Sequence, residues 1–268
     1  MPLTTLCRGN QIVALVPTPT SLSISNPPSC SSANDFTKGS PSTVDESGDP
    51  ALFTEGIAEI CRRMGVEFRF GTKIRRLAVE RKRISQVETN DGPLDADLYV
   101  LALGKDSASL VRPLGIGLPI YPVKGYSRTL SLRGWNTAPT MPLVDYDRRV
   151  GLVRFGDRFR IVGKAEFVGD DDRHDPRRAG ALVDSVTDVF PELAAREVIE
   201  DWAGLRPMTP DGMPIIGPSP YENLFVNTGH GHLGLTLSCG SAAVIGSLVA
   251  GQAPEVDIAA YSVNRFRL

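Results

Sequence analysis

The sequence predicts a mixed α/β (α+β) fold with an incomplete Rossmann-like lobe and a second lobe built on an antiparallel sheet. Residues 96–104, "ADLYVLALG", are apolar on both faces, which is typical of a buried central strand. Residues 121–168 alternate strand-like runs with turn signals, which is typical of an antiparallel sheet. A G-x-G-x-x-G, made by Gly229, Gly231 and Gly234, lies between a strand-like run and a helix-like run.

The bulk composition narrows the class of protein. The chain has 268 residues, 41% of them hydrophobic, which is enough for one large domain or two small ones. A net charge of -2 gives no reason to expect a nucleic-acid partner. No apolar run reaches the roughly 18 residues that cross a bilayer, and the start lacks a signal-peptide pattern. We therefore expect a cytoplasmic protein.

The four cysteines give no sign of a disulfide framework or of a metal site. They are scattered and lack C-x-x-C spacing, so we expect ordinary thiols of a reducing compartment. They are Cys7, Cys30, Cys61 and Cys239.

Residues 1–44 differ from the rest of the chain. They are rich in Ser, Pro and Thr and have few large apolar side chains, so they bury too little surface to offset the entropy of ordering. We expect this segment to be largely irregular, with at most one short strand at residues 11–16.

Regular structure is predicted from Asp49 onward. Asp49 can cap a helix, Pro50 suits its first position and Gly65 ends it. The apolar residues Leu52, Phe53, Ile57, Ile60 and Met64 fall on one face of that helix. Strand-like runs follow at residues 66–70, 73–80, 83–89 and 97–103.

Further elements are expected in the second half of the chain. A helix fits residues 176–189, and a strand followed by a buried helix fits residues 223–227 and 235–250. The first of these helices turns apolar side chains inward, namely Leu182, Val183, Val186, Val189 and Phe190. The segment 197–219 is expected to be a strand that enters a Pro/Gly-rich loop.

The glycine motif meets only part of the requirement for a dinucleotide fingerprint. Such a fingerprint needs a complete βαβ unit and an acidic residue about 20 positions further on. Glu255 has roughly that spacing, but too few residues follow the helix to complete the unit. The motif therefore predicts an anion-binding helix N-terminus without the domain that binds adenosine. The alternative is a glycine-rich turn that only packs a terminal helix.

The surrounding residues resemble a known family. Residues 204–251, "GLRPMTPDGMPIIGPSPYENLFVNTGHGHLGLTLSCGSAAVIGSLVAG", are similar to the C-terminal segment of FAD-dependent D-amino acid dehydrogenase small subunits. These proteins belong to the superfamily of D-amino acid oxidase, glycine oxidase and sarcosine oxidase. The upstream stretches "DESGDPALFTEGIAEICRRMGVEFRFGTKIRRL", "ADLYVLALG" and "LPIYPVKGYSRTL" resemble the family in the same order. The resemblance covers about residues 45–266.

The resemblance implies a domain organisation. Residues 45–120 and 200–268 match the FAD-binding lobe, and residues 121–199 match the substrate lobe. Residues 1–44 do not resemble the N-terminal strand and G-x-G-x-x-G loop that hold the ADP part of FAD in the family. We therefore expect an N-terminally truncated family member with an atypical leading segment, in which independent FAD binding is in question.

The resemblance also implies a cofactor site. In the family, the second glycine-rich element lies against the flavin ring, so the backbone N–H groups from Gly231 to Thr236 are expected to face its pyrimidine edge. The residues assigned to FAD are Ile74, Ala102, Leu103, Gly104, Gly229, His230, Gly231, His232, Leu233, Gly234, Leu235 and Thr236. The alternative for His230 and His232 is a metal-binding pair, but no third ligand with suitable spacing is visible.

Two residues are implied in substrate binding. Arg206, in the family's "GLRP" motif, is expected to pair with the amino-acid carboxylate, which a guanidinium can bind in a bidentate manner. The alternative is a structural arginine that bridges loop carbonyls. Tyr126 is expected to add a hydroxyl near the carboxylate or to shape the pocket, and Asp211 and Gly212 are expected to form a structural turn.

The implied reaction is oxidation of a D-amino acid by hydride transfer from Cα to flavin N5, followed by hydrolysis to a 2-oxo acid and ammonia. In the dehydrogenases the electrons pass to a respiratory carrier such as quinone, and the family is often peripheral to the inner membrane. Two alternatives stay open: an oxidase of glycine- or sarcosine-type amines on the same scaffold, and a truncated, non-catalytic remnant.

Overall fold

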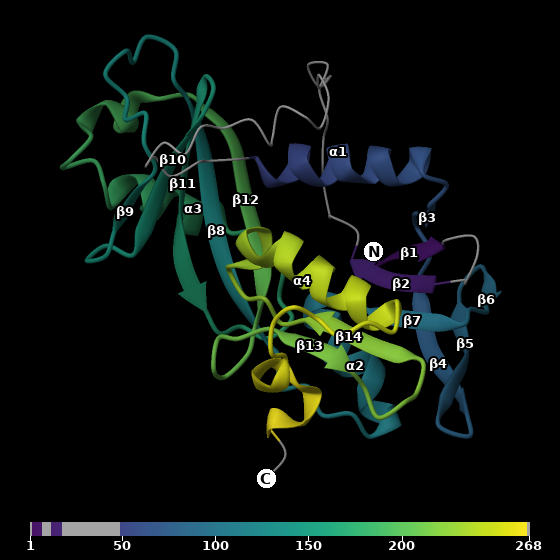
Figure 1. The fold of residues 1–268 in the computed structure, drawn as a ribbon. Coiled ribbons are helices and arrows are strands. Elements are labelled where there is room, and N and C mark those ends of the chain that lie inside the picture. Colours follow the sequence, from purple (N-terminus) through teal and green to yellow (C-terminus); the bar gives the residue numbers. More distant parts are fainter. Residues whose placement is uncertain (1, 7–11, 18–48, 267–268) are drawn as a thin grey trace. The chain divides into compact units, whose positions relative to one another are not determined.

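The computed structural model describes residues 2–6, 12–17 and 49–266 (Figure 1). This part of the chain divides into two compact units. The first contains the two N-terminal strands with residues 57–122 and 206–266, and the second contains residues 49–56 and 123–205. The assignment of FAD binding to one lobe and of substrate binding to the other stays a prediction.

A six-stranded sheet forms the centre of the first unit, in the order β13-β14-β7-β2-β1-β3. Strand β7 (Leu98–Leu101) pairs in parallel with β14 (Leu224–Thr228) on one side and with β2 (Ile12–Pro17) on the other. Tyr99 and Leu101 on β7 are fully buried. The prediction of a buried central strand at this point of the chain is confirmed.

The remaining strands of this sheet are antiparallel to their neighbours. They are β1 (Pro2–Leu6), β3 (Glu67–Arg69) and β13 (Ile215–Pro218). The expectation of at most one strand near the N-terminus is wrong, because β1 and β2 both form. Their backbones pair with each other and with β3 and β7, and such pairing overrides a weak local preference. The predicted irregular segment between residues 18 and 44 lies outside the described residues.

A three-stranded antiparallel sheet also belongs to the first unit. It consists of β4 (Ile74–Glu80), β5 (Arg83–Thr89) and β6 (Gly92–Leu94). The first two strands confirm the predicted pair, whereas β6 was not predicted. Leu77 and Val87 bury their side chains in the same core cluster as Tyr99 and Leu101.

Helix α1 (Pro50–Arg63) confirms the predicted start and end signals. The Asp49 carboxylate accepts a hydrogen bond from the Ala51 amide over 2.9 Å, and Gly65 ends the segment with φ +89°. The apolar face of the helix is not buried, since α1 has no buried residue. Met64 is 79% exposed.

Helix α4 (Gly234–Val249) follows the glycine motif, as predicted. The expectation that it is a buried helix is wrong, because only Ser241 and Ile245 are buried. Ile245 packs with Val100 and Ile216 of the sheet. Helical periodicity turns only one stripe of α4 toward the sheet, so a helix without charged residues still leaves its other side exposed.

The second unit is built on a five-stranded antiparallel sheet in the order β12-β8-β11-β10-β9. Its strands are β8 (Tyr121–Ser131), β9 (Leu143–Asp145), β10 (Val150–Phe155), β11 (Arg158–Glu166) and β12 (Val198–Met208). Phe155 pairs with Arg158 around the predicted turn at Gly156. The antiparallel sheet predicted for residues 121–168 is confirmed.

Helix α3 (Pro176–Asp184) covers the core of the second unit. It is shorter than predicted, and the following turns carry Val186, which is buried, and Val189, which is 52% exposed. The inward orientation is therefore confirmed for Leu182, Val183 and Val186 and is wrong for Val189. The described residues also contain short helical segments: α2 (Ser107–Val111), η2 (Gly104–Asp106), η3 (Arg112–Leu114), η4 (Pro191–Ala195), η5 (Ala259–Tyr261) and η6 (Val263–Phe266).

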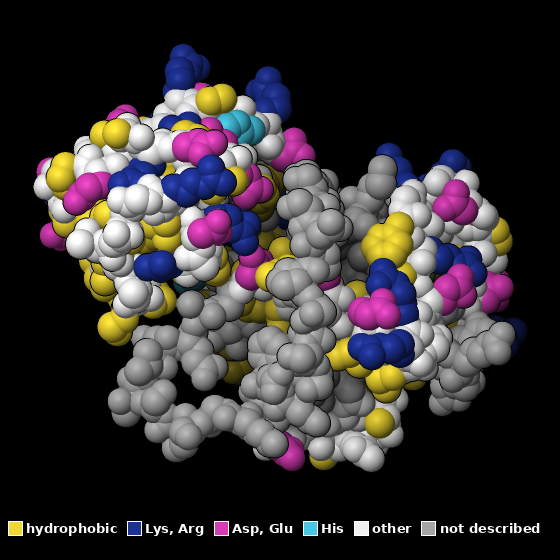
Figure 2. Space-filling model, turned by 90° about the horizontal axis from the view of Figure 1, so that it is seen from above, with side chains coloured by type: hydrophobic (Ala, Val, Ile, Leu, Met, Phe, Trp, Pro, Cys, Tyr) yellow, Lys and Arg dark blue, Asp and Glu magenta, His cyan; other side chains and the backbone are white. Residues whose placement is uncertain are grey.

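Charges of both signs mix on the molecular surface. On the face that Figure 2 shows, Lys and Arg side chains lie among Asp and Glu side chains of the described residues. No helix of the described ranges combines the length and the apolar character needed to cross a bilayer. Of the cysteines, Cys61 and Cys239 lie in the described part, and both are free thiols.

Candidate functional site

Three chain segments meet in the first unit, where β7, β12 and β14 end. The Gly231 amide donates a hydrogen bond to the Pro207 carbonyl oxygen over 3.1 Å. The Thr228 hydroxyl donates to the Gly104 carbonyl oxygen, also over 3.1 Å. A Cβ atom built on Gly104 would lie 3.8 Å from Cγ of Pro207. The segments that the sequence singles out separately are thus neighbours in space.

The glycine turn needs glycine for two reasons. Gly229 and Gly231 have φ angles of +75° and +56°, which L side chains rarely adopt. A Cβ atom on Gly229 would lie 2.8 Å from Cγ2 of Thr209, and one on Gly231 would lie 2.8 Å from Sδ of Met208. The turn therefore packs closely against Met208 and Thr209, and its backbone conformation favours glycine at both positions.

The backbone amides of this turn are used unequally. The Gly231 amide is held by Pro207, and the Leu233 amide donates to the His230 carbonyl oxygen over 3.0 Å. Helix α4 begins at Gly234 without a side-chain cap, and the first amides of a helix have no partner within it. The amides from Gly234 to Thr236 are therefore those that the helix itself leaves for a ligand. Leu235 lies in this first turn.

The N-terminus of α4 is a favourable place for negative charge. The aligned peptide dipoles of a 16-residue helix give its N-terminus a partial positive charge. Anions, including the charged edge of a cofactor, are stabilised there without a cationic side chain. The expectation that the amides of Gly231–Thr236 face flavin thus stays a prediction. The position at the start of α4 favours the amides of Gly234 to Thr236 for this role.

His230 faces its own helix. Its Nε2 is hydrogen-bonded to the Ser241 hydroxyl over 2.9 Å, and Ser241 lies in the second turn of α4 and is buried. Burial lowers the pKa of His230, so the neutral ring is favoured. His232 is exposed. Within the described ranges, no group of three metal-ligating side chains forms.

Arg206 lies near the end of β12, directly before Pro207. The side chain is half-buried, and burial lowers its pKa from the ordinary arginine value. A guanidinium can bind a carboxylate in a bidentate manner, and the carboxylate role of Arg206 stays a prediction.

The segment after Arg206 forms a tight turn, as expected for Asp211 and Gly212. The Thr209 hydroxyl donates to the Met213 carbonyl oxygen over 2.8 Å, and the Gly212 amide donates to the Thr209 carbonyl oxygen over 3.2 Å. Gly212 has φ +74°. Thr209 was missed in the sequence, although its β-branched methyl group fills the space beside Gly229.

The other residues assigned to the cofactor occupy two places. Ala102 and Gly104 follow β7 directly, and Gly104 has φ +58°. A buried hydroxyl pair fixes this point, because the Ser107 and Thr228 hydroxyls lie 3.0 Å apart. Ile74 begins β4 and packs against the core cluster that contains Leu77.

Tyr126 lies in the core of the second unit and is 3% exposed. Its hydroxyl donates to the Glu166 carboxylate over 3.0 Å. Burial and this carboxylate raise the pKa of Tyr126 to about 12. The single hydroxyl proton is thus engaged by Glu166, and both predicted roles of Tyr126, near the carboxylate or in shaping the pocket, stay predictions.

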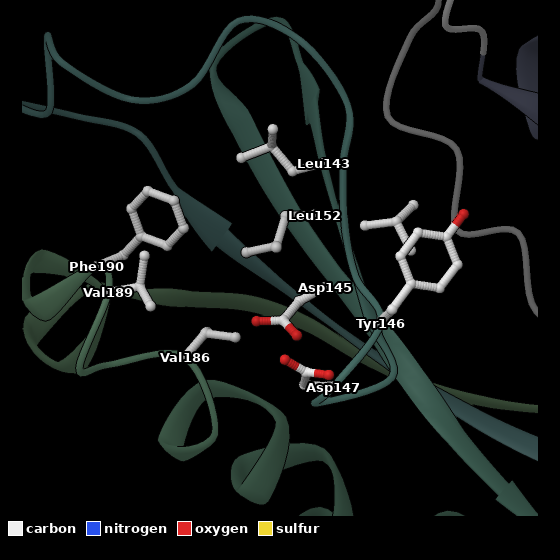
Figure 3. A pocket seen from close by; sticks show the side chains of 9 residues that line it. Leu143, Asp145, Tyr146, Asp147, Leu152, Val186, Val189 and Phe190 are labelled. Carbon is white, nitrogen blue, oxygen red and sulfur yellow. The ribbon is translucent and has the colours of Figure 1, made fainter.

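A shallow hollow of about 470 Å³ lies elsewhere in the second unit (Figure 3). Apolar side chains line it, among them Tyr146, Val189 and Phe190, and Asp145 and Asp147 lie at one side. The Asp145 carboxylate accepts hydrogen bonds from the Arg148 side chain and amide over 2.7 and 2.8 Å. Because few polar groups converge there, this hollow lacks the pattern of a ligand site.

The fold and the glycine turn define a class of flavoenzyme. The chain belongs to the DAO family of FAD dependent oxidoreductases, whose family model matches residues 27–248. A D-amino acid dehydrogenase of Bradyrhizobium diazoefficiens is 47% identical over 223 residues, which cover 83% of this chain and 53% of the relative. A second D-amino acid dehydrogenase, from Methylobacterium nodulans, is 48% identical over 79% of this chain and 51% of its own length. The chain spans about half the length of these curated relatives.

Solved structures agree with the family. Glycine oxidase from Geobacillus kaustophilus superimposes with a TM-score of 0.65 at 26% identity, over 72% of this chain and 52% of that one. Iminodiacetate oxidase from Chelativorans sp. BNC1 gives a TM-score of 0.72 at 25% identity, over 79% and 57%. The mixed α/β fold predicted from the sequence is therefore confirmed as that of a DAO-type flavoenzyme.

Proposed function

We propose that this chain acts in the FAD-dependent oxidation of D-amino acids to 2-oxo acids and ammonia. The observation that carries the proposal is the packing of the glycine turn against the segment after Arg206, fixed by the bond from Gly231 to Pro207. It brings an anion-stabilising helix N-terminus and a half-buried guanidinium into one compact unit. The relatives that are 47–48% identical are named D-amino acid dehydrogenases.

The residues of the glycine turn fit the ring of a flavin. The positive φ angles at Gly229 and Gly231 favour glycine, so the turn carries no side chain at these two positions. A flat ring can approach such a backbone closely, and the free amides of α4 can donate to its polar edge. FAD, when bound, supplies the acceptor for the hydride that leaves the substrate Cα.

Arg206 is proposed to orient the substrate. Its planar fork binds a carboxylate through two parallel hydrogen bonds, which fixes the amino acid against rotation. The neutral His230, bonded to Ser241, is proposed to hold the glycine turn in shape instead of transferring a proton. Ile74, Ala102, Gly104 and His232 are retained as proposed cofactor contacts.

The ADP part of FAD would need contacts other than those of the glycine turn. The sequence holds a single G-x-G-x-x-G, and this is the turn assigned to the flavin ring. We propose that the bound ring depends on this turn, whereas the ADP part receives little from the described residues. The proposed electron acceptor is a respiratory carrier such as quinone, because the relatives are named dehydrogenases and not oxidases.

A second candidate is oxidation of glycine- or sarcosine-type amines, which the similarity to glycine oxidase favours. The test is to reconstitute the purified chain with FAD, remove free FAD, and follow reduction of an artificial dye or of oxygen. Reduction of the dye by D-amino acids supports the dehydrogenase, and oxygen consumption with glycine or sarcosine supports the oxidase. A chain that retains no flavin absorbance contradicts both and leaves a non-catalytic remnant.

A further inference from the structure

Arg265 joins the segment η6 to the turn that follows β12. The Arg265 Nε donates to Oδ2 of Asp211 over 2.8 Å, and Nη2 donates to Oδ1 of the same carboxylate over 3.1 Å. Nη2 also donates to the Met213 carbonyl oxygen over 2.7 Å. The guanidinium thus binds both a side chain and the backbone of residues 209–213, which lie more than 50 positions earlier in the sequence.

The third nitrogen of the Arg265 guanidinium, Nη1, is bound by residues that lie just before Arg265 in the sequence. Nη1 donates to the Tyr261 carbonyl oxygen over 3.2 Å and lies 3.5 Å from the Ser262 carbonyl oxygen. All three nitrogens of the group therefore have acceptors, and the side chain is 11% exposed. Only a guanidinium offers donors in this fixed planar arrangement, so a lysine cannot replace it.

The turn held by Arg265 contacts the candidate site through Thr209. Thr209 begins the turn, and its Cγ2 occupies the space where a side chain at Gly229 would start. Arg206 and Pro207 lie at the end of β12, and Met208 joins them to the turn. A shift of residues 209–213 would therefore move both the wall of the glycine turn and the end of the strand that carries Arg206.

We propose that Arg265 is a positioning residue, which fixes the turn at residues 209–213 and through Thr209 sets the glycine turn at Gly229 and Gly231. We call the contacts of Arg265 with Asp211 and Met213 the Arg265 latch. The inference that the latch serves substrate binding rests on the proposed function. The mechanical part, which is the restraint of the two turns, does not depend on it.

The test uses hydrogen exchange of the whole chain, measured by mass spectrometry. Arg265→Gln and Asp211→Asn should each speed exchange at the Gly212 and Gly231 amides by about tenfold or more, because each removes charge-assisted hydrogen bonds between Arg265 and the turn. The double variant should exchange no faster than either single one, since both remove the same latch. Arg265→Lys should not restore slow exchange.

The matched control is Arg173→Gln. Arg173 also holds a carboxylate through two bonds, to Asp171 over 2.8 and 3.1 Å, but it is 87% exposed and the pair is local. This control should leave the two turns unchanged. The latch is overturned if exchange in the two turns stays slow in Arg265→Gln. It is also overturned if exchange in the strands β8, β10 and β11 rises as much as in the turns, or if the double variant exchanges faster than either single variant.

A kinetic readout links the latch to the site. With FAD in saturating excess, Arg265→Gln should raise KM for a D-amino acid about tenfold, with kcat within about twofold, because the end of β12 that carries Arg206 loses its restraint while excess FAD keeps the loosened glycine turn occupied. A tenfold loss in kcat with an unchanged KM overturns the positioning role. If the wild-type chain oxidises no D-amino acid but the exchange pattern holds, the proposed function fails and the latch stands.

Discussion

The Gly231 amide and the Pro207 carbonyl oxygen lie 3.1 Å apart and form a hydrogen bond between two segments that share no local sequence relation. This bond fixes the glycine turn against the end of β12. Since Pro207 follows Arg206, it also places the residue next to Arg206 in contact with the glycine turn. The candidate site is thus formed jointly by the glycine turn and the end of β12.

Replacement of Gly231 by alanine should damage the turn. The added Cβ meets Sδ of Met208, the end of a flexible side chain that can move, so the main cost comes from the left-handed backbone at φ +56°. We expect a loss of about 1–2 kcal/mol in the free energy of unfolding and weaker flavin binding. Urea unfolding with and without FAD measures both.

Gly240→Ala is the control for that experiment. Gly240 lies inside α4 with nothing within 4 Å of its Cβ position, so alanine should stabilise the helix by about 0.5–1 kcal/mol. If both variants behave alike, the special conformation of Gly231 has no energetic significance.

Arg206→Ala should raise KM for D-amino acids by about ten- to a hundredfold, because a bidentate, charge-assisted contact with the carboxylate is lost. Arg206→Lys keeps the charge and loses the fork, so an intermediate KM is expected. Steady-state kinetics of the reconstituted chain, with the exposed Arg112→Ala as control, checks this. Unchanged kinetics in Arg206→Ala would refute the carboxylate role.

His230 predicts a pH dependence of stability. Burial lowers the pKa of His230 below the ordinary histidine value of 6.5, so the unfolded chain binds a proton more readily than the folded chain. Its contribution to stability is therefore present above pH 6.5 and is lost as the pH falls below that value. Urea unfolding between neutral pH and about pH 5 should show this loss.

The control for His230 uses the two histidines of the motif. His230→Gln should flatten the pH dependence, whereas His232→Gln, at an exposed position, should leave it in place. A pH dependence that survives in His230→Gln would assign it to another group.

Asp211 should give a second pH dependence of stability, which arises from a charged carboxylate that is stabilised by hydrogen bonds. Hydrogen bonds from Arg265 lower the pKa of Asp211 from 3.8 to about 2. A lowered folded-state pKa gives stability that is present above about pH 4 and is lost as the pH falls toward about 2. The stability difference between the wild-type chain and Asp211→Asn should shrink over this window. A constant difference would mean that the carboxylate charge is not what holds Arg265.

The sequence was sufficient to predict the elements with strong local signals. The cap at Asp49, the double-sided apolar run at β7 and the turn at Gly156 predicted their elements within a few residues. These signals are local, because a capping side chain or a turn glycine acts within a few positions of the backbone.

Contacts between distant segments could not be predicted in this way. The strand β1 and the exposure of α4 depend on which backbones pair and on which side of a helix finds a neighbour. Likewise, the glycine motif indicated a close approach without showing that its neighbours are Met208 and Thr209. The bond from His230 to Ser241 spans 11 residues and had no distinctive sequence signal.

The central claim is that the turn at residues 229–236 binds the flavin ring, and flavin fluorescence tests it most directly. Titration of the chain into riboflavin, FMN and FAD should quench all three with similar affinity, because the proposed contacts involve the ring, and Gly231→Val should abolish the quenching. Binding of FAD that depends on its ADP part, or equal quenching by Gly231→Val, would contradict the account.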